Sequence, residues 1–377
     1  MIRIDEIYEN TFLPWVRKNL PTTSIFYCDP FGRSDPDSIL CRGLENPDDE
    51  DHAIFFFDQE PVQLSIHVPT FDRFIMSSPQ IDTASRFLVC SETNSDNVDY
   101  ICKRFNLRPL YYFFHGWAAL DWFRGYDRTF LIEPIRSREI KKTFFSPNRI
   151  IGGERKHRVL MLYSMAHHNL LHNNISAPAI CPVENQSIQE IAKYFWARYP
   201  NPETGIVKVI SSMNLPMLFP GEDTQRMSSC WLDQIDLATE SMIYHVSETV
   251  YFGRRQHLTE KTFKPIAMGM PFVLSAPAHS LSYIRSYGFK TFSDVWDEGY
   301  DLIEDDYDRN RILCTLLKHL DKLTIQQKQQ MFEKCIPIIE HNWNHFYHGG
   351  FEKVLWAELT TMLHNLKAAT QGDLSSN

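Results

Sequence analysis

Short, almost uninterrupted apolar runs that end in turn residues recur along this chain, and they constrain its fold most strongly. Such runs are typical of strands that are buried on both faces, as in parallel sheets. We therefore expect strands at 24–30, 53–61, 86–92, 129–135, 157–166, 206–212, 241–248 and 271–277.

Helical patterns lie between these runs. "SIQEIAKYFWARYP" places Ile188, Ile191 and Phe195 on one face of a helix, and "HSLSYIRSYGF" ends at Gly288, a typical C-cap residue. Alternating strands and helices predict βαβ units and a doubly wound α/β fold. From about residue 305 onward, the spacing of the apolar residues predicts helices.

A basic stretch with a Gly-Gly pair, "KKTFFSPNRIIGGERKHR" at 141–158, precedes a new predicted strand. We place a domain boundary there, with an N-terminal α/β domain over 1–150. A C-terminal α/β domain that carries the terminal helices covers 151–377. Two Rossmann-like domains of this kind are typical of GT-B glycosyltransferases, although a fold alone does not determine function.

The composition indicates a folded protein, with 43% hydrophobic residues and a formal net charge of -9. This charge argues against a generally basic nucleic-acid binder. Eight cysteines without a CxxC pair predict reduced thiols, and no signal-like or membrane-spanning apolar run is present, so we expect a cytoplasmic location. The absence of GxGxxG, P-loop, GxSxG and kinase signatures argues against dehydrogenases, NTPases, lipases and kinases.

The stretch "HLTEKTFKPIAMGMPFVLSAP" at 257–277 carries the strongest chemical signal. Thr259 is a suitable N-cap, with Glu260 and Lys261 in the first helical turn, although Pro265 weakens the helix prediction. The predicted strand 241–248 precedes this helix, and ligands of open α/β sheets bind at the carboxyl ends of strands. Helix N-termini also favour phosphate, so we expect an anion site here.

Five residues in and around this predicted anion site are candidates for ligand contacts. Arg254, Arg255 and Lys261 are candidates to neutralise a diphosphate, and Glu248 or Glu260 to accept hydrogen bonds from ribose or sugar hydroxyls. The alternative is a capped helix beside a solvated arginine pair. The local chemistry leaves both interpretations open.

Residues 245–277, "HVSETVYFGRRQHLTEKTFKPIAMGMPFVLSAP", resemble the donor-binding motif of the α1,3-fucosyltransferases. That motif contains Phe-Glu-Asn-Ser, a loop, Tyr-(Ile/Val)-Thr-Glu-Lys, a helix and a Val-Pro-Val-Val strand. Glu248 matches its first Glu, Thr259, Glu260 and Lys261 match Thr-Glu-Lys, and 270–273 match the strand. The resemblance implies a GT-B fold in which the domain 151–377 binds a nucleotide-sugar donor and the domain 1–150 lies on the acceptor side.

The sequence departs from that motif at Thr249, which replaces Asn, at His257, which replaces Tyr, and in a longer loop between the two elements. These departures leave the identity of the donor open. The continuation "YIRSYGFKTFSDVWDEGYD" resembles a segment of glycosyltransferase-like proteins from phages and aquatic bacteria. For a viral protein, the expected location is the host cytoplasm.

Two carboxylates, Asp58 and Glu60, follow the apolar run "FFF". A carboxylate at a strand's carboxyl end is well placed to act as a general base. The fucosyltransferases carry a Glu-Ser-Pro element after a strand of their N-terminal domain, and Glu60-Pro61 resembles it without the Ser. The resemblance implies Glu60 as the base, with Asp58 as second choice, whereas the alternative is an acidic turn at which Pro61 ends the strand.

Arg158 is the best candidate within the basic segment 155–158 to reach donor phosphates, although this segment equally fits a solvated linker. His167, His168 and His172 lack an HExxH pattern, and the acidic run 304–308 fits a helix start, so we expect no metal. A GT-B enzyme needs none, because basic side chains and helix N-termini can stabilise the leaving diphosphate.

The densest aromatic segment spans 110–127. Aromatic faces stack on sugars, so His115, Trp117 and Asp121 are candidates for an acceptor site, although most of these rings are expected in the core.

Together these features predict an inverting, metal-independent glycosyltransferase that moves a sugar from a nucleotide-diphosphate sugar to a glycan or another acceptor hydroxyl. Two alternatives stay open. One is a phage-type enzyme that glycosylates hydroxymethylated bases in DNA. The other is a non-catalytic α/β protein that binds nucleotides or glycans.

Overall fold

The computed structural model describes residues 4–28, 41–43, 52–57, 59–77, 85–124, 135–181, 185–196, 198, 205–222, 232 and 234–373. The chain forms two compact units. The first unit combines Met1–Asp121, Arg254–His257 and Phe351–Asn377, and the second combines Trp122–Gly253 and Leu258–Gly350. This division does not coincide with the expected boundary between 150 and 151, because strand β6 (Lys142–Ser146) pairs with β10 (Ser241–Ser247) inside the second unit.

The first unit contains a sheet with the strand order β2-β1-β3-β4-β5. The four strands β1, β3, β4 and β5 run parallel, and β2 pairs with β1 in the antiparallel direction. Apolar side chains make up most of β3 and β4, as buried strands require. The strands are β1 (Thr23–Cys28), β2 (Cys41–Gly43), β3 (His52–Phe57), β4 (Ser85–Cys90) and β5 (Leu107–Tyr111).

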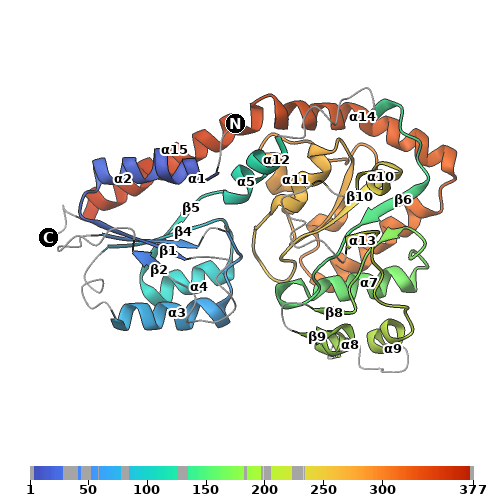
Figure 1. The fold of residues 1–377 in the computed structure, drawn as a ribbon, viewed down its shortest axis with the longest axis horizontal. Coiled ribbons are helices and arrows are strands. Elements are labelled where there is room, and N and C mark those ends of the chain that lie inside the picture. Colours follow the sequence, from blue (N-terminus) through green and yellow to red (C-terminus); the bar gives the residue numbers. More distant parts are fainter. Residues whose placement is uncertain are drawn as a thin grey trace. The chain divides into compact units, whose positions relative to one another are not determined.

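Helices cover both faces of this sheet. Figure 1 shows α3 (Leu64–Ser77) and α4 (Asp96–Phe105) on one side and α2 (Leu13–Asn19) and α15 (Gly350–Asp373) on the other. Phe55 packs on Phe71 of α3 at 5.2 Å, whereas its neighbour Phe56 meets Phe12 at 4.7 Å on the opposite face. The remaining helices are α1 (Ile4–Ile7), the π-helix η1 (Tyr8–Phe12) and α5 (Phe114–Phe123).

The second unit contains a parallel sheet with the strand order β11-β10-β6-β7. From β6 the chain passes to β7 on one side and later to β10 and β11 on the other, so the strand order reverses between β6 and β10. Such a topological switch point is where open α/β sheets bind their ligands. The two outer strands are β7 (Asn174–Ile175) and β11 (Phe272–Ser275).

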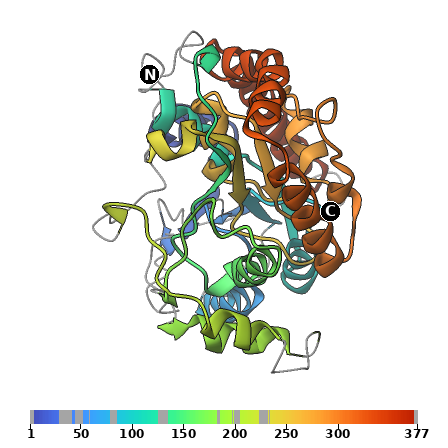
Figure 2. The same ribbon diagram turned by 90° about the vertical axis from the view of Figure 1, so that its right-hand side faces the viewer.

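Helices surround the sheet of the second unit, and Figure 2 shows the long α13 (Asp306–Asp321) and α14 (Ile325–Tyr347) in orange to red. Helix α7 (His157–His167) packs on α13, and α11 (Glu260–Ala267) packs on α14 and β10. The shorter elements are η5 (Gly153–Arg155), β8 (Ile180–Cys181), β9 (Gln186–Ser187), α8 (Ile188–Ala192), η6 (Lys193–Phe195), α9 (Ile206–Ser211), α10 (Ile235–Thr239), α12 (Ser280–Ser286) and η8 (Gly299–Leu302).

Two of the predicted strands are wrong. The run 157–166 forms helix α7, because its Leu and Met residues favour a helix and its side chains are buried almost all round. The run 206–212 contains α9, whose buried Ile206 and Ile210 have the i, i+4 spacing of one helical face. That face packs against α7 and α8 and outweighs the β-branched composition.

The broad expectation of an α/β protein with parallel sheets and C-terminal helices is confirmed, and both units are compatible with Rossmann-like domains. The helices at 188–195 and before Gly288 are also confirmed. Most of the predicted strand 129–135 lies outside the described residues. Within the described part of the chain, no helix is long and apolar enough to cross a membrane.

Candidate functional site

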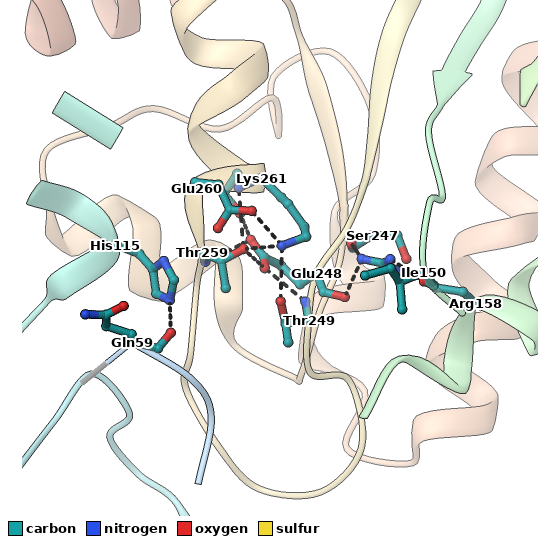
Figure 3. Close-up of polar contacts among 11 residues, drawn as sticks. Gln59, His115, Ile150, Arg158, Ser247, Glu248, Thr249, Thr259, Glu260 and Lys261 are labelled. Atoms are coloured by element: carbon teal, nitrogen blue, oxygen red, sulfur yellow. Dashed lines mark hydrogen bonds and ion pairs between the residues drawn. The ribbon is translucent and has the colours of Figure 1, made fainter. Parts of the chain in front are cut away.

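Glu248 ties the end of β10 to the start of α11 in the second unit (Figure 3). Its carboxylate is fully buried and accepts from the backbone N–H groups of Thr249 and Thr259, each at 3.1 Å. It also accepts from the hydroxyls of Thr259 at 2.6 Å and Thr262 at 2.5 Å. A carboxylate with four donors fixes the N-terminus of α11 at the carboxyl end of the strand.

Lys261 lies in the first turn of α11, where its ammonium is held by three oxygens (Figure 3). Nζ is 2.7 Å from Oε1 of Glu260, 3.2 Å from Oγ1 of Thr249 and 3.3 Å from Oγ1 of Thr259. The Lys261 side chain is 27% exposed, whereas that of Glu260 is 5% exposed. The helix N-terminus and a partly exposed cation therefore lie at the same place, which is favourable for an anion.

Arg158 bridges the loops that follow β6 and β10, at the switch point of the sheet (Figure 3). Its guanidinium donates to the carbonyl oxygens of Ile150 and Ser247, each at 2.6 Å, and of Glu248 at 3.3 Å. It is buried, its hydrogen-bond acceptors in the described residues are carbonyl oxygens, and the carboxylates of Glu248 and Glu260 attract its charge. Burial lowers the pKa of Arg158 to about 9, and the charge of Arg155 acts in the same direction.

A row of buried polar side chains crosses the sheet behind this site. His245 on β10 contacts the hydroxyls of Ser146 on β6 at 2.8 Å and Ser275 on β11 at 3.0 Å. Burial lowers the pKa of His245 to about 3, with a smaller effect from the charge of Arg158. His245 is therefore neutral at pH 7, and its two hydrogen bonds connect three strands.

Asn148 provides a second buried polar group near the switch point. Its Nδ2 donates to the carbonyl of Ser146 at 3.3 Å and to its hydroxyl at 3.2 Å, while its Oδ1 has no hydrogen-bond partner in the described structure. The Nε of Arg158 is also buried without a partner there. Buried polar atoms of this kind are uncommon in folded proteins and are more frequent where a ligand or water completes the bonding.

Two arginines of the expected donor set lie in the first unit instead. Arg255 is buried and pairs with Glu92 at 2.7 Å, and Arg254 pairs with Asp96 at 2.6 Å and with Asp99 at 2.7 Å. The structure therefore gives both arginines carboxylate partners and places neither in the cluster around Lys261.

Among the expected acceptor-side residues, His115 lies beside the segment that carries Glu60. Its Nε2 donates to the carbonyl oxygen of Gln59 at 2.7 Å (Figure 3), and Glu60 itself is half-buried after β3. Trp117 belongs to the core, where its ring meets Trp356 at 4.8 Å. Asp121 is half-buried on α5, and Asp58 lies outside the described residues.

Of the three histidines considered for a metal, His167 and His168 contact each other, with ring centroids 5.4 Å apart. His167 ends α7, His168 follows it as the cap residue, and His172 pairs with Asp321 at 3.2 Å. Among the residues that the structure describes, no three His, Cys, Asp or Glu side chains gather as a metal site would require.

Sequence reasoning missed His157, His245 and Thr262, which complete the surroundings of the site. The sequence does carry a signal for a buried structural glutamate. Ser-Glu-Thr lies at the end of a central parallel strand both at 91–93 and at 247–249. In both places the glutamate is buried and accepts several hydrogen bonds.

Comparison of the chain with protein-family models, curated proteins and solved structures found no match in any of the three.

Proposed function

We propose that this chain is a glycosyltransferase of GT-B-like architecture that uses a nucleotide-diphosphate sugar. The observation that carries the proposal is the placement of the Lys261 ammonium in the first turn of α11, at the carboxyl end of β10. Glu248 holds this turn with four hydrogen bonds, so the cation and the helix N–H groups are oriented before any ligand arrives. Such pre-orientation lowers the cost of binding an anion.

The diphosphate of the donor would interact with Lys261 and with the charge of Arg158. Arg158 donates hydrogen bonds only to carbonyl oxygens, and a bound diphosphate would add a charged partner to the carboxylates of Glu248 and Glu260 that already act on it. Because these two cations and the α11 N-terminus can stabilise the leaving diphosphate, the proposed reaction requires no metal. We assign neither Arg254 nor Arg255 to the donor, since both are paired with carboxylates.

The two glutamates receive different roles. We assign Glu260 to ribose or sugar hydroxyls, because it lies beside Lys261 in the first turn of α11 and a carboxylate can accept several hydrogen bonds. Glu248 already accepts four hydrogen bonds inside the protein, so we assign it to holding the loop and the helix rather than to the sugar.

Glu60 of the first unit is the proposed general base. It would take the proton of an acceptor hydroxyl while the hydroxyl oxygen attacks the anomeric carbon from the face opposite the diphosphate. The bond from the anomeric carbon to the phosphate oxygen then breaks, and the diphosphate leaves with the electron pair, which inverts the configuration. The hydrogen bond from His115 to the carbonyl of Gln59 supports this role, because it fixes the backbone next to Glu60.

Calorimetric titration with GDP, UDP, ADP and dTDP, in buffer with EDTA, tests the donor site. We expect one nucleotide class to bind the wild-type protein, and Lys261→Met to weaken its binding by about tenfold or more. Lys290→Met is the matched control, because Lys290 is an exposed lysine of the same unit outside this cluster. If none of the four diphosphates binds, the proposed function is wrong.

Release of nucleoside diphosphate from the corresponding nucleotide sugar, with glycan or hydroxymethylated-DNA acceptors, tests the chemistry. Glu60→Gln should retain donor binding and lose transfer by about a hundredfold or more, since general-base catalysis contributes that much. A wild-type protein that binds the donor and transfers to no acceptor would indicate a binding protein instead. A transfer rate that Glu60→Gln leaves intact would exclude Glu60 as the base.

A further inference from the structure

A partly exposed cluster of aromatic rings lies on the second unit, where the exposed Tyr194 meets the half-buried Phe252 and Tyr307; these three residues are called the aromatic surface below. The ring centroid of Phe252 lies 6.3 Å from that of Tyr194 and 6.4 Å from that of Tyr307. Tyr194 is 58% exposed although it is a large ring. Grouped rings that reach the surface mark binding sites more often than isolated ones do.

Two cations lie against these rings. Nζ of Lys156 is 5.0 Å from the ring centroid of Tyr194, and the guanidinium carbon of Arg198 is 5.4 Å from that of Tyr307. Arg198 also lies 4.0 Å from the exposed carboxylate of Asp305, a distance at which the attraction in water is weak. The aromatic surface therefore combines flat apolar faces with positive charge.

Buried side chains connect the aromatic surface with the proposed phosphate site, since Tyr251 and His157 are each 1% exposed. Phe252 contacts Tyr251 at 5.5 Å, and the ring of His157 stacks on Tyr251 at 4.9 Å with an interplanar angle of 10°. Nε2 of His157 is 3.2 Å from the hydroxyl of Ser247, and the next residue, Arg158, donates to the carbonyls of Ser247 and Glu248. The loop after β10 and the N-terminus of α7 therefore connect the aromatic surface with the proposed phosphate site.

The chemistry of this surface selects its occupant. A neutral sugar could stack on the rings but would make little use of Lys156 and Arg198. A nucleoside diphosphate has a planar base that stacks on aromatic faces and phosphates that attract the cations. We propose that the aromatic surface stacks the nucleobase of the nucleoside diphosphate whose phosphates Lys261 contacts. This inference rests on the proposed function and extends it to the part of the ligand that determines affinity.

The test compares nucleoside diphosphates with inorganic pyrophosphate, which carries the phosphates without a base. We expect the wild-type protein to bind one of GDP, UDP, ADP and dTDP about tenfold or more tightly than pyrophosphate, since stacking of a base on aromatic rings adds to the affinity. The double variant Tyr194→Leu/Phe252→Leu should lose this preference and keep its affinity for pyrophosphate. Trp196→Leu is the control, because Trp196 is exposed nearby but is not part of the aromatic surface.

Phe252→Tyr keeps an aromatic face and should retain the preference, which separates stacking from a folding defect. A nucleotide preference that survives in the double variant would overturn this inference and leave the proposed function in place. Equal binding of pyrophosphate and all four nucleotides by the wild-type protein would have the same consequence. If neither pyrophosphate nor any nucleotide binds, the proposed function fails and this inference fails with it.

Discussion

Arg255 and Glu92 form a two-point ion pair in the interior of the first unit. Nε of Arg255 is 3.0 Å from Oε1 of Glu92, and its NH2 is 2.7 Å from Oε2. The two side chains are 6% and 1% exposed, and Glu92 also accepts from the backbone N–H of Val62 at 3.0 Å and from the hydroxyl of Ser95. The pair anchors the short segment Arg254–His257 within the first unit.

Breaking this pair should destabilise the protein strongly. Glu92→Gln leaves the Arg255 charge buried without its carboxylate, and loss of one partner of a buried pair costs about 3–5 kcal/mol. We expect a corresponding decrease in the free energy of unfolding, measured by urea denaturation and followed by tryptophan fluorescence.

Asp96→Asn provides the matched control, because it weakens the ion pair of the neighbouring Arg254 at the surface. That pair is well exposed on both sides, so solvent screens it and the variant should unfold close to the wild type. Equal losses of stability in the two variants would show that breaking the buried pair of Arg255 and Glu92 costs no more than breaking an exposed one.

Glu248 should matter for stability as much as for the ligand site. Glu248→Gln replaces an oxygen that accepts hydrogen bonds by an NH2 group facing donors, at a position where Thr249, Thr259 and Thr262 all donate. Leaving buried donors unsatisfied costs about 1–3 kcal/mol each, so we expect a loss of at least about 2 kcal/mol in urea unfolding. Thr262→Val removes one of the donors instead and should cost less. The assignment of Glu248 to the scaffold is wrong if Thr262→Val is the more damaging change.

The parallel strands were predictable because their apolar runs carry the signal locally. The runs 241–248 and 271–277 contain β10 and β11, and Thr259 caps α11 as its sequence context indicates. Strand β6 was missed, since "KTFFS" is short and lies within a basic stretch that resembles a linker. Helix α7 was mistaken for a strand because an apolar run without polar interruptions has no readable period.

The partners of the site residues could not be read from the sequence in the same way. Arg255 and Glu92 are separated by 163 positions, and only the tertiary structure shows that an arginine in the donor motif is already paired. Arg158 was chosen for its charge and for its place next to a predicted strand that is in fact α7, whereas its position at the switch point depends on the order of β6 and β10. The sequence therefore identified candidate site residues, but it did not predict the contacts that decide their roles.

His245 makes stability depend on acid pH. Burial lowers its pKa in the folded protein from 6.5 to about 3, and the charge of Arg158 adds to this effect. Below pH 6.5 the unfolded chain takes up a proton that the folded protein does not accept until about pH 3. The free energy of unfolding should therefore fall as the pH decreases through this window, by about 1.4 kcal/mol per pH unit for one such group.

His245→Gln isolates this contribution, because glutamine can keep polar contacts with Ser146 or Ser275 and does not titrate. The variant should be less stable than the wild type at pH 8, and its stability should decline less steeply between pH 6.5 and about pH 4. Urea unfolding at a series of pH values measures both slopes. Parallel slopes would mean that His245 is protonated with similar ease in the folded and unfolded states.

Gly269, between α11 and β11, should tolerate no side chain. Its φ of +61° lies in the left-handed region, and a Cβ there would overlap Cδ1 of the buried Ile135 and lie 3.1 Å from its Cγ1. Gly253 has a φ of +80° with nothing within 4 Å of a Cβ, so Gly253→Ala reports the backbone strain alone, about 1–2 kcal/mol. Gly269→Ala should cost about 1–3 kcal/mol more than that.

Ile135→Val supplies the decisive comparison because it removes the methyl group with which the new Cβ would collide. Gly269→Ala should therefore destabilise the Ile135→Val protein less than it destabilises the wild type, and the two substitutions should not be additive. The measurement is a double-mutant cycle of urea unfolding free energies. Strict additivity would show that backbone strain, rather than the contact with Ile135, makes glycine necessary where α11 turns toward β11.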